Sequence, residues 1–343
     1  MAFDRWSDVG MVVYDLEDVL LPGTLLQNGK YHVVSYLSAG GFGIAYLARN
    51  SDGRDVVLKE CFVSEFCRRS GGRVIPRSEA HKHNMKRAIT SFLDEAQTLA
   101  TLSHSNIVQA HHAFEENDTA YVVLDYIKGH DLQEIVDDKK ASLSPGQLVT
   151  IAQRLISALV HVHGRGLLHC DISPDNVCLG QNGEPVLIDF GSARHCVNGV
   201  GQPHAGFSMV KDGYSPPEFY TQNAPCGPSS DIYALGATLY HAVGGAAPVD
   251  GQTRQTALVD GQLDPLEPLR GRISGYPAGF LASIDRAMSV RASLRFASAK
   301  DWLRALAQPA PEAPGDVLML RPAPRPVVLH ASPHLETDQK RKA

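Results

Sequence analysis

The chain has 343 residues, of which 43% are hydrophobic and 20% are charged, and its formal net charge is -5. This is the composition of a globular protein with enough chain to bury a full core, so it excludes a small fold held together by disulfides. The mild negative charge argues against binding of nucleic acid through bulk charge, which requires clustered lysine and arginine. At roughly 150 residues per domain, we expect about two domains.

Cysteines and apolar runs narrow the class of protein further. The six cysteines include no C-x-x-C pair, so the sequence contains neither a zinc-ribbon nor a thioredoxin-type motif. Acidic residues interrupt the N-terminal stretch, which leaves no apolar core for a secretory signal. No apolar run reaches the roughly 18 residues that a membrane-spanning helix needs. We therefore expect free thiols, no membrane segment and a cytoplasmic location.

The N-terminal elements are predicted to form a sheet with one helix. Three short β-rich runs between residues 31 and 59, separated by turn residues, predict an antiparallel meander. After a polar stretch, apolar residues recur at helical spacing from Ile89 to Ala100 and predict an amphipathic helix. Two further runs, near 107–114 and 121–126, complete the predicted sheet.

The second half of the chain is predicted to be mainly helical. The run Ser144-Pro145-Gly146-Gln147 has the pattern of a capping box with proline at the first helical position. Apolar residues then recur at helical spacing up to Gly164, which predicts one long helix. Further helices are expected near 230–243, 280–288 and 297–306.

Two features among the predicted strands favour binding of a polyphosphate. The run Gly40-Gly41-Phe42-Gly43 lies at a turn, where glycines let backbone N–H groups approach an anion closely. Lys59 ends the third strand, and Glu95 on the predicted helix would compensate the cost of burying its charge. A simple tight turn and a solvated lysine are the structural alternatives. The spacing of Lys59 after the glycine run favours a role for Lys59 in holding phosphates.

The most specific pattern is His169-Cys-Asp171-Ile-Ser-Pro-Asp-Asn176, followed by Asp189-Phe-Gly191. Magnesium prefers oxygen ligands and several waters, so Asn176 and Asp189 suffice together with the phosphates of ATP. Asp171 is then left to accept a hydroxyl proton. The alternative is that Asp171 and Asn176 only cap turns around Pro174. That alternative would not explain why both motifs follow a glycine loop and a lysine in the sequence.

With these motifs the chain resembles the eukaryotic-type (Hanks-type) serine/threonine protein kinases found in bacteria. The resemblance covers about residues 31–306 and also rests on Ser215-Pro-Pro-Glu218, Asp231-Ile-Tyr-Ala-Leu-Gly236 and Arg295. It implies an α+β, bilobal protein kinase-like fold with an N-terminal antiparallel sheet plus one helix and a mainly α-helical C-terminal lobe.

The domain boundaries follow from the resemblance and from composition. The implied kinase domain is 31–307, with an N-terminal lobe at 31–127 and a C-terminal lobe at 128–307. Residues 1–30 would form an N-terminal extension. The proline- and alanine-rich residues 308–343 are expected to be a disordered tail, because they bury too little apolar surface to offset the entropy of ordering.

The resemblance implies catalytic and metal-binding roles for individual residues. Lys59 would contact the α- and β-phosphates and pair with Glu95 in the active state. Asp171 would orient and deprotonate the substrate hydroxyl, while Asn176 and Asp189 would hold Mg²⁺. The residues expected to bind ATP are Ser38, Gly40, Gly41, Phe42, Gly43, Ala45, Val57, Lys59, Leu124, Asp125, Ile127 and Cys178.

Supporting roles are also implied. Glu218 and Arg295 would form a buried ion pair that anchors the activation segment, the stretch between Asp189 and Glu218. Asp231 would brace the catalytic loop. The side chains expected to stack in the active state are His169, Phe190 and Leu99.

Three positions depart from the family pattern. Ser38 takes the place of the first loop glycine, so the loop is expected to be stiffer while ATP binding survives. Ser173 stands where serine/threonine kinases usually have a lysine that touches the γ-phosphate, and the loss of that charge would lower the rate of transfer. Cys170 replaces the arginine that meets a phosphorylated residue, so regulation by phosphorylation of the activation segment is less expected.

Two other residues bear on regulation. Ser208 is the main internal hydroxyl of the activation segment, and its replacement is expected to leave most activity intact. Cys170 and Cys196 would form a thiol switch if the folded segment brought them together. Two unpaired cytosolic cysteines are the simpler interpretation.

The resulting prediction is an ATP- and Mg²⁺-dependent protein kinase that phosphorylates serine or threonine in protein substrates and autophosphorylates. A cognate metal-dependent protein phosphatase is an implied partner, whereas nucleic acid and membranes are not expected. One alternative is a pseudokinase-like scaffold, which the three departures would mark. The other is a small-molecule kinase, which would not be expected to carry the motifs that contain Glu218, Asp231 and Arg295.

Overall fold

Alternation of apolar and polar side chains builds an antiparallel sheet from the N-terminal part of the chain. The computed structural model describes residues 18–41, 43–138, 143–197, 200–201, 210–221 and 224–307. Strand β2 (Tyr31–Gly40) pairs with β3 (Gly43–Asn50), which in turn pairs with β4 (Asp55–Cys61). The predicted three-stranded meander is therefore confirmed.

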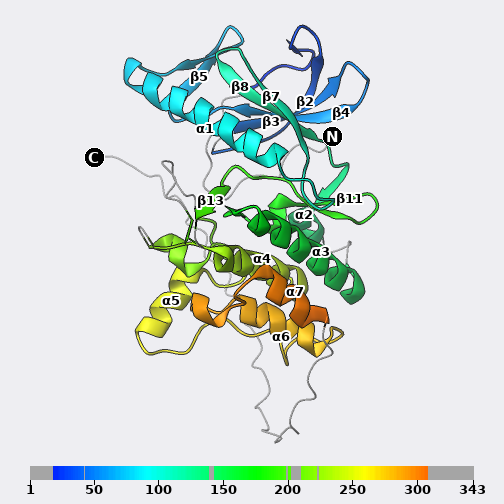
Figure 1. Ribbon diagram of the computed structural model, residues 1–343, viewed down its shortest axis with the longest axis vertical. Helices are drawn as coiled ribbons and strands as arrows, with labels where there is room; N and C mark the ends of the chain where they lie inside the picture. Colours follow the sequence, from blue (N-terminus) through cyan, green and yellow to red (C-terminus); the bar gives the residue numbers. More distant parts are fainter. Residues whose placement is uncertain are drawn as a thin grey trace, which may run out of the picture. The chain divides into compact units, whose positions relative to one another are not determined.

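In the described residues this sheet has six strands, in the order β1-β2-β3-β4-β8-β7, and Figure 1 shows it above the helical part. Strands β7 (Ala110–Glu116) and β8 (Thr119–Asp125) arise from the two later β-rich runs. Strand β1 (Leu25–Leu26) pairs with β2, and Leu26 is completely buried. The packed core thus begins before Tyr31. A strand of two residues is too short to produce a periodic pattern, so the sequence did not indicate it.

Helix α1 (Lys82–Ala100) is the predicted amphipathic helix, and it packs against β7 and β8 (Figure 1). Its buried side chains include Phe92, Ala96 and Leu99, which recur every three or four residues and so lie on one face. Glu95 on the same helix lies next to Ala96 in sequence. Helix α1 therefore carries core residues and also Glu95, the carboxylate expected to pair with Lys59.

The polar stretch before α1 is a hairpin of β5 (Cys67–Ser70) and β6 (Arg73–Pro76), which was not predicted from the sequence. Arg69 donates a hydrogen bond of 2.5 Å to a carboxylate oxygen of Glu60, and Glu60 is completely buried. The Tyr46 hydroxyl donates to the same carboxylate at 2.8 Å. A buried ionic network therefore joins this hairpin to β4, in addition to the buried side chains of Cys67 and Val74.

The long helix of the second half, α3 (Pro145–Gly164), begins where the capping pattern predicts. The Ser144 N–H donates to the Gln147 side chain at 2.8 Å, and the Gln147 N–H donates to the Ser144 hydroxyl at 3.3 Å. These two bonds satisfy backbone groups that the first turn leaves unpaired. The predicted capping box is confirmed.

The other predicted helices are α4 (Pro228–Gly244), α6 (Ala278–Ala287) and α7 (Ala299–Ala307), and each is present. Helices α2 (Leu132–Asp137) and α5 (Gly251–Val259) were not predicted. Helix α2 is short, and α5 buries only Gly251 and Arg254, so it has no apolar stripe. The remaining strands are β9 (Gly129–Asp131), β10 (Leu167–Leu168), β11 (Val177–Gly180), β12 (Pro185–Leu187), β13 (Arg194–Val197) and β14 (Val200–Gly201). Short 3-10 turns cover Glu79–His81, Pro174–Asn176, Pro217–Tyr220 and Ala292–Leu294.

One cluster of buried apolar side chains continues from α1 and β8 into α3 and α4. It joins the sheet to the helical part, and the backbone of Val108 adds a hydrogen bond to Leu187. The expected α+β class, with an antiparallel N-terminal sheet and a mainly helical C-terminal part, is confirmed. In the described parts of the chain, every helix is too short or too polar to cross a membrane.

Candidate active site

Lys59 lies on an interior strand and carries a largely buried charge. Strand β4 pairs with β3 on one side and with β8 on the other. The Lys59 ammonium donates to Asp189 Oδ1 at 2.6 Å, and the Lys59 side chain is 19% exposed. Burial acts to lower the pKa of Lys59, but the Asp189 and Glu95 carboxylates outweigh it and the pKa is raised. Lys59 is therefore a protonated, preorganised cation.

Asp189 is held as an anion after β12. Its Oδ1 accepts the bond from Lys59 and another from the Gly191 N–H at 2.8 Å. Burial acts to raise the pKa of Asp189, yet the Lys59 ammonium outweighs it and the pKa is lowered. A Cβ at position 191 would lie 3.0 Å from Lys59 Nζ and 3.1 Å from Asp189 Oδ1. Glycine at 191 therefore lets the chain pass close to this ion pair.

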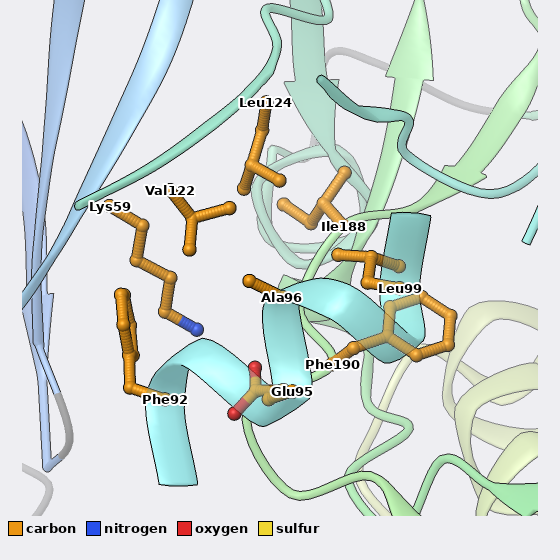
Figure 2. A pocket seen from close by; sticks show the side chains of 9 residues that line it. All are labelled: Lys59, Phe92, Glu95, Ala96, Leu99, Val122, Leu124, Ile188 and Phe190. Atoms are coloured by element: carbon orange, nitrogen blue, oxygen red, sulfur yellow. The ribbon is translucent and has the colours of Figure 1, made fainter. Parts of the chain in front are cut away.

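Glu95 projects from α1 toward the Lys59 ammonium (Figure 2). Among the described residues, the ion pair that Lys59 forms is with Asp189 and not with Glu95. Burial raises the pKa of Glu95 to about 7, although Lys59 opposes the shift. The Lys59–Glu95 pair expected for the active state is thus not made in this structure, and it stays a prediction.

A small cavity lies beside Lys59 and Glu95 (Figure 2). The other residues that line it are Phe92, Ala96, Leu99, Val122, Leu124, Ile188 and Phe190. The ring centroids of Phe190 and His169 are 4.4 Å apart. Phe190 therefore contacts His169 and also lines the cavity with Leu99, which brings the three residues of the expected stack into one neighbourhood.

The loop that contains Asp171 is held by the side chains of Asn176 and Asp231. Asn176 Nδ2 donates to the Asp171 carbonyl at 2.8 Å and to Asp171 Oδ2 at 3.0 Å. Asp231 accepts hydrogen bonds from the backbone N–H groups of His169 and Cys170, each at 2.8 Å. Cys170 has a φ of 64°, a left-handed conformation that costs energy in a residue with a side chain. The buried Asp231 carboxylate compensates that cost and orients the loop.

Lys211, from the activation segment, reaches the same loop. Its ammonium donates to Ser173 Oγ at 2.7 Å and to Asp175 Oδ2 at 2.8 Å, and it lies 3.6 Å from Asp171 Oδ1. Burial acts to lower the pKa of Lys211, but Asp171 and Asp175 outweigh it and the pKa is raised. Lys211 was not predicted from the sequence. The signal that could have indicated it is the serine at position 173, because that serine leaves the loop without its usual cation.

The residues expected around adenine lie on neighbouring strands. Ala45 is the register partner of Lys59, and Val57 is the register partner of Leu124. Opposed residues share a face of the sheet, so these side chains lie on one side of it. The Cys178 thiol lies 3.7 Å from the carbonyl oxygen of Ile127, and burial raises the pKa of Cys178 to about 11.

The glycine-rich turn lies at the end of the β2–β3 hairpin. Ser38 pairs with Ala45, and Gly40 pairs with Gly43, across the hairpin that Gly41 helps to connect. Phe42 lies outside the described residues. The turn therefore leads into β3, which pairs with β4, the strand that carries Lys59.

Asp125 ends strand β8, where the segment between the two parts of the chain begins. Its side chain accepts a hydrogen bond of 2.7 Å from the ring of His111. Its backbone N–H donates to the Gln109 carbonyl at 3.0 Å. Asp125 is thus held against strand β7 and the residues that precede it.

The activation segment is anchored by a buried ion pair. Arg295 Nη1 and Nη2 donate to Glu218 Oε1 and Oε2 at 2.7 and 2.9 Å, and the Arg295 side chain is 0% exposed. Burial acts to raise the pKa of Glu218, but the bonds from Arg295 outweigh it and the pKa is lowered. The two parallel bonds hold the end of the segment against the helical part.

The residues considered for regulation are only partly described. Ser208 lies outside the described residues, as does the side chain of Cys196, so the Cys170–Cys196 switch stays a hypothesis. Cys170 packs with Cys226, next to Phe219. Cys170 and Cys226 are both free thiols in this structure.

Comparison with known proteins identifies the family to which the chain belongs. The family described as "Protein kinase domain" matches residues 31–267. Over 213 residues the chain is 34% identical to the serine/threonine-protein kinase Nek1 of Mus musculus, a match that covers 62% of this chain and 16% of that protein. Over 226 residues it is 28% identical to the serine/threonine-protein kinase PrkC of Bacillus subtilis (strain 168), covering 66% of this chain and 32% of that protein.

A solved structure titled "PpkA-294 apo form" is also similar. It matches with a TM-score of 0.72 at 26% identity, and the match covers 84% of this chain and 99% of that chain. The chain spans less than half the length of both curated relatives named above, since it covers 16% and 32% of them. The similarity therefore concerns their shared domain.

Proposed function

Because the chain belongs to the protein kinase domain family, we propose that it transfers the γ-phosphoryl group of ATP to serine or threonine hydroxyls of protein substrates. The observation that carries the proposal is the 2.6 Å contact between Lys59 and Asp189, next to a loop in which Asn176 holds Asp171. Phosphoryl transfer requires positioning and charge stabilisation more than covalent chemistry. A buried cation, an ionised carboxylate and a fixed second carboxylate supply these requirements.

Each side chain has a distinct task in the proposed reaction. Asp171 orients the substrate hydroxyl and takes its proton as the oxygen bonds to the γ-phosphorus. The bond from that phosphorus to the bridging oxygen breaks, and ADP leaves with the electron pair. Lys59 binds the α- and β-phosphates, for which it must exchange Asp189 for Glu95 as its carboxylate partner.

The residues proposed for Mg²⁺ fit a hard cation. Asn176 commits its amide nitrogen to Asp171, so the amide oxygen is the atom that remains for a metal. Asp189 has a lowered pKa and is therefore an ionised oxygen ligand at neutral pH. When bound, Mg²⁺ would neutralise charge on the phosphates.

The resemblance adds finer parts to the proposal. We expect autophosphorylation, a cytoplasmic location, and a metal-dependent phosphatase that opposes the kinase. The residues proposed to enclose the adenine are Ala45, Val57, Leu124 and Cys178, with Asp125 and Ile127 offering backbone groups. The turn Ser38–Gly43 would cover the phosphates.

A scaffold without catalysis is the second candidate, and two observations favour it. The Lys59–Glu95 pair expected for the active state is not made in this structure, and Ser173 supplies no charge to the catalytic loop. The intact set of Lys59, Asp171 and Asp189 opposes this candidate. A small-molecule kinase is disfavoured because such an enzyme would not be expected to carry the Glu218–Arg295 pair.

Transfer of label from Mg-ATP to a generic basic protein tests the proposal. The wild-type chain is expected to label the protein, and the Asp189→Ala variant is expected to lose nearly all incorporation. An exposed aspartate, Asp52, provides the matched control as Asp52→Ala. Equal incorporation by wild type and Asp189→Ala would refute kinase activity and favour the scaffold.

A further inference from the structure

The catalytic loop lacks a cation at position 173, where the family usually has a lysine. Ser173 is completely buried, and its hydroxyl accepts a hydrogen bond of 2.7 Å from the Lys211 ammonium. The two residues are 38 positions apart in sequence. The structure therefore brings a lysine from the activation segment to the site of the missing lysine.

The ammonium of Lys211 lies beside the carboxylate proposed to receive the hydroxyl proton. It is 3.6 Å from Asp171 Oδ1. Among the described residues, its hydrogen-bond acceptors are Ser173 Oγ at 2.7 Å and both carboxylate oxygens of Asp175, at 2.8 and 3.1 Å. An ammonium has three N–H donors, so when the two Asp175 oxygens share one of them, one remains for an acceptor beside Asp171.

We propose that Lys211 supplies, from the activation segment, the positive charge that the catalytic loop lacks at Ser173, and that it stabilises the phosphoryl group during transfer. This inference rests on the proposed kinase function. As the hydroxyl oxygen bonds to phosphorus and the bridging oxygen departs, negative charge spreads over the phosphoryl oxygens. A fixed ammonium next to Asp171 compensates that charge without reorganisation.

The backbone around Lys211 holds it in place without a phosphate group. The Lys211 N–H donates to Ser215 Oγ at 2.8 Å, and the Ser215 N–H donates to the Lys211 carbonyl at 2.8 Å. The Glu218–Arg295 pair anchors the end of the same stretch. Folding of the described residues 210–218 thus delivers the cation, which agrees with Cys170 in place of a phosphate-binding arginine.

Substitution of Lys211 tests the inference. Lys211→Met is expected to lower kcat about 100-fold, because a preorganised donor to the transferred group is lost. Lys211→Arg keeps the charge and is expected to retain most of the rate. Lys82, which forms an exposed ion pair of 2.8 Å with Glu79, provides the matched control as Lys82→Met. Full kcat in Lys211→Met would overturn the inference.

A second pair of substitutions distinguishes a catalytic role of Lys211 from a role in anchoring the activation segment. It removes the positive charge at position 211 and places one at position 173. Lys211→Ser alone is expected to lose activity, and the addition of Ser173→Lys is expected to raise that activity at least about tenfold. An anchoring role predicts no restoration, because the pair between position 211 and Asp175 would still be absent. Failure of Ser173→Lys to restore activity would contradict the role of Lys211 as the source of the missing charge.

Nucleotide affinity gives a readout that does not depend on turnover. Calorimetry with Mg²⁺ is expected to show that Lys211→Met binds a non-hydrolysable ATP analogue about tenfold more weakly and ADP unchanged. An equal loss of affinity for both nucleotides, or no loss for either, would contradict contact between Lys211 and the terminal phosphate. A wild-type chain with no activity above Asp171→Asn would instead mean that the proposed kinase function is wrong.

Discussion

The Lys59 ammonium and the Asp189 carboxylate lie 2.6 Å apart, although 130 positions separate them in sequence. The contact joins strand β4 to the segment after β12. Each group stabilises the charge of the other at the centre of the site, where the Lys59 side chain is 19% and the Asp189 side chain 40% exposed. Binding of nucleotide and Mg²⁺ would redistribute these two charges between phosphates and metal, with Glu95 as the remaining partner for Lys59.

Glu95→Gln is predicted to increase stability while it reduces activity. The pKa of Glu95 is raised from 4.5 to about 7 by burial, so ionisation of Glu95 costs the folded state free energy. That cost grows as the pH rises from 4.5 to about 7 and is constant above, and glutamine avoids it. At pH 8 the free energy of unfolding should rise by on the order of 2 kcal/mol.

Urea denaturation of wild type and Glu95→Gln at pH 5 and pH 8 checks this prediction. The stability advantage of the variant should be larger at pH 8. Its kinase activity should fall at least about tenfold, because the proposed active state contains the Lys59–Glu95 pair. An advantage that is the same at both values of pH would contradict the raised pKa.

Glu218→Gln is predicted to destabilise the protein at neutral pH by about 3 kcal/mol, since it leaves the buried Arg295 guanidinium without its anion. The pKa of Glu218 is lowered from 4.5, so its contribution is complete above 4.5 and is lost as the pH falls through the lower folded value. The difference between wild type and variant should therefore shrink in acid. Thermal unfolding between pH 7 and pH 3 measures it, and a constant difference would argue against the ion pair.

Ser208→Ala is predicted to leave most kinase activity intact. Cys170 stands in place of the arginine that would bind a phosphorylated residue, and Lys211 is held by Ser215 and needs no phosphate. The initial rate of the variant should be within about threefold of the wild-type rate, since no ion pair is removed. A loss of activity as large as that of Asp171→Ala would show that phosphorylation of Ser208 is required.

Local pattern was sufficient to predict much of the fold. The strands β2 to β4 and the helices α1 and α3 carry strong periodicity, and Ser144 and Gln147 mark a helix start by their chemistry alone. The β5–β6 hairpin could not be predicted in this way, because each of its strands buries a single apolar or thiol side chain, Val74 or Cys67, and the buried Arg69–Glu60 pair joins it to the sheet. Long-range ionic contacts leave no periodic trace.

In the site, too, contacts within a short motif could be predicted from the sequence, whereas contacts between distant segments could not. Asp171 and Asn176 lie within one short motif, so their proximity follows from spacing, and the structure joins them by a 3.0 Å hydrogen bond. Lys211 reaches Ser173 only because the activation segment folds back across 38 positions. Sequence indicated that a cation was missing at 173, and tertiary structure was needed to identify its replacement.

Phosphoamino-acid analysis of a protein substrate, after incubation with Mg-ATP and either wild type or Asp171→Asn, tests the central claim most directly. We predict phosphoserine or phosphothreonine with the wild-type chain. With the variant, the rate of formation of the phosphoamino acid should fall about 1000-fold, because the carboxylate proposed to accept the proton is lost. The same amount of phosphoamino acid with both proteins, or none with either, would contradict the account.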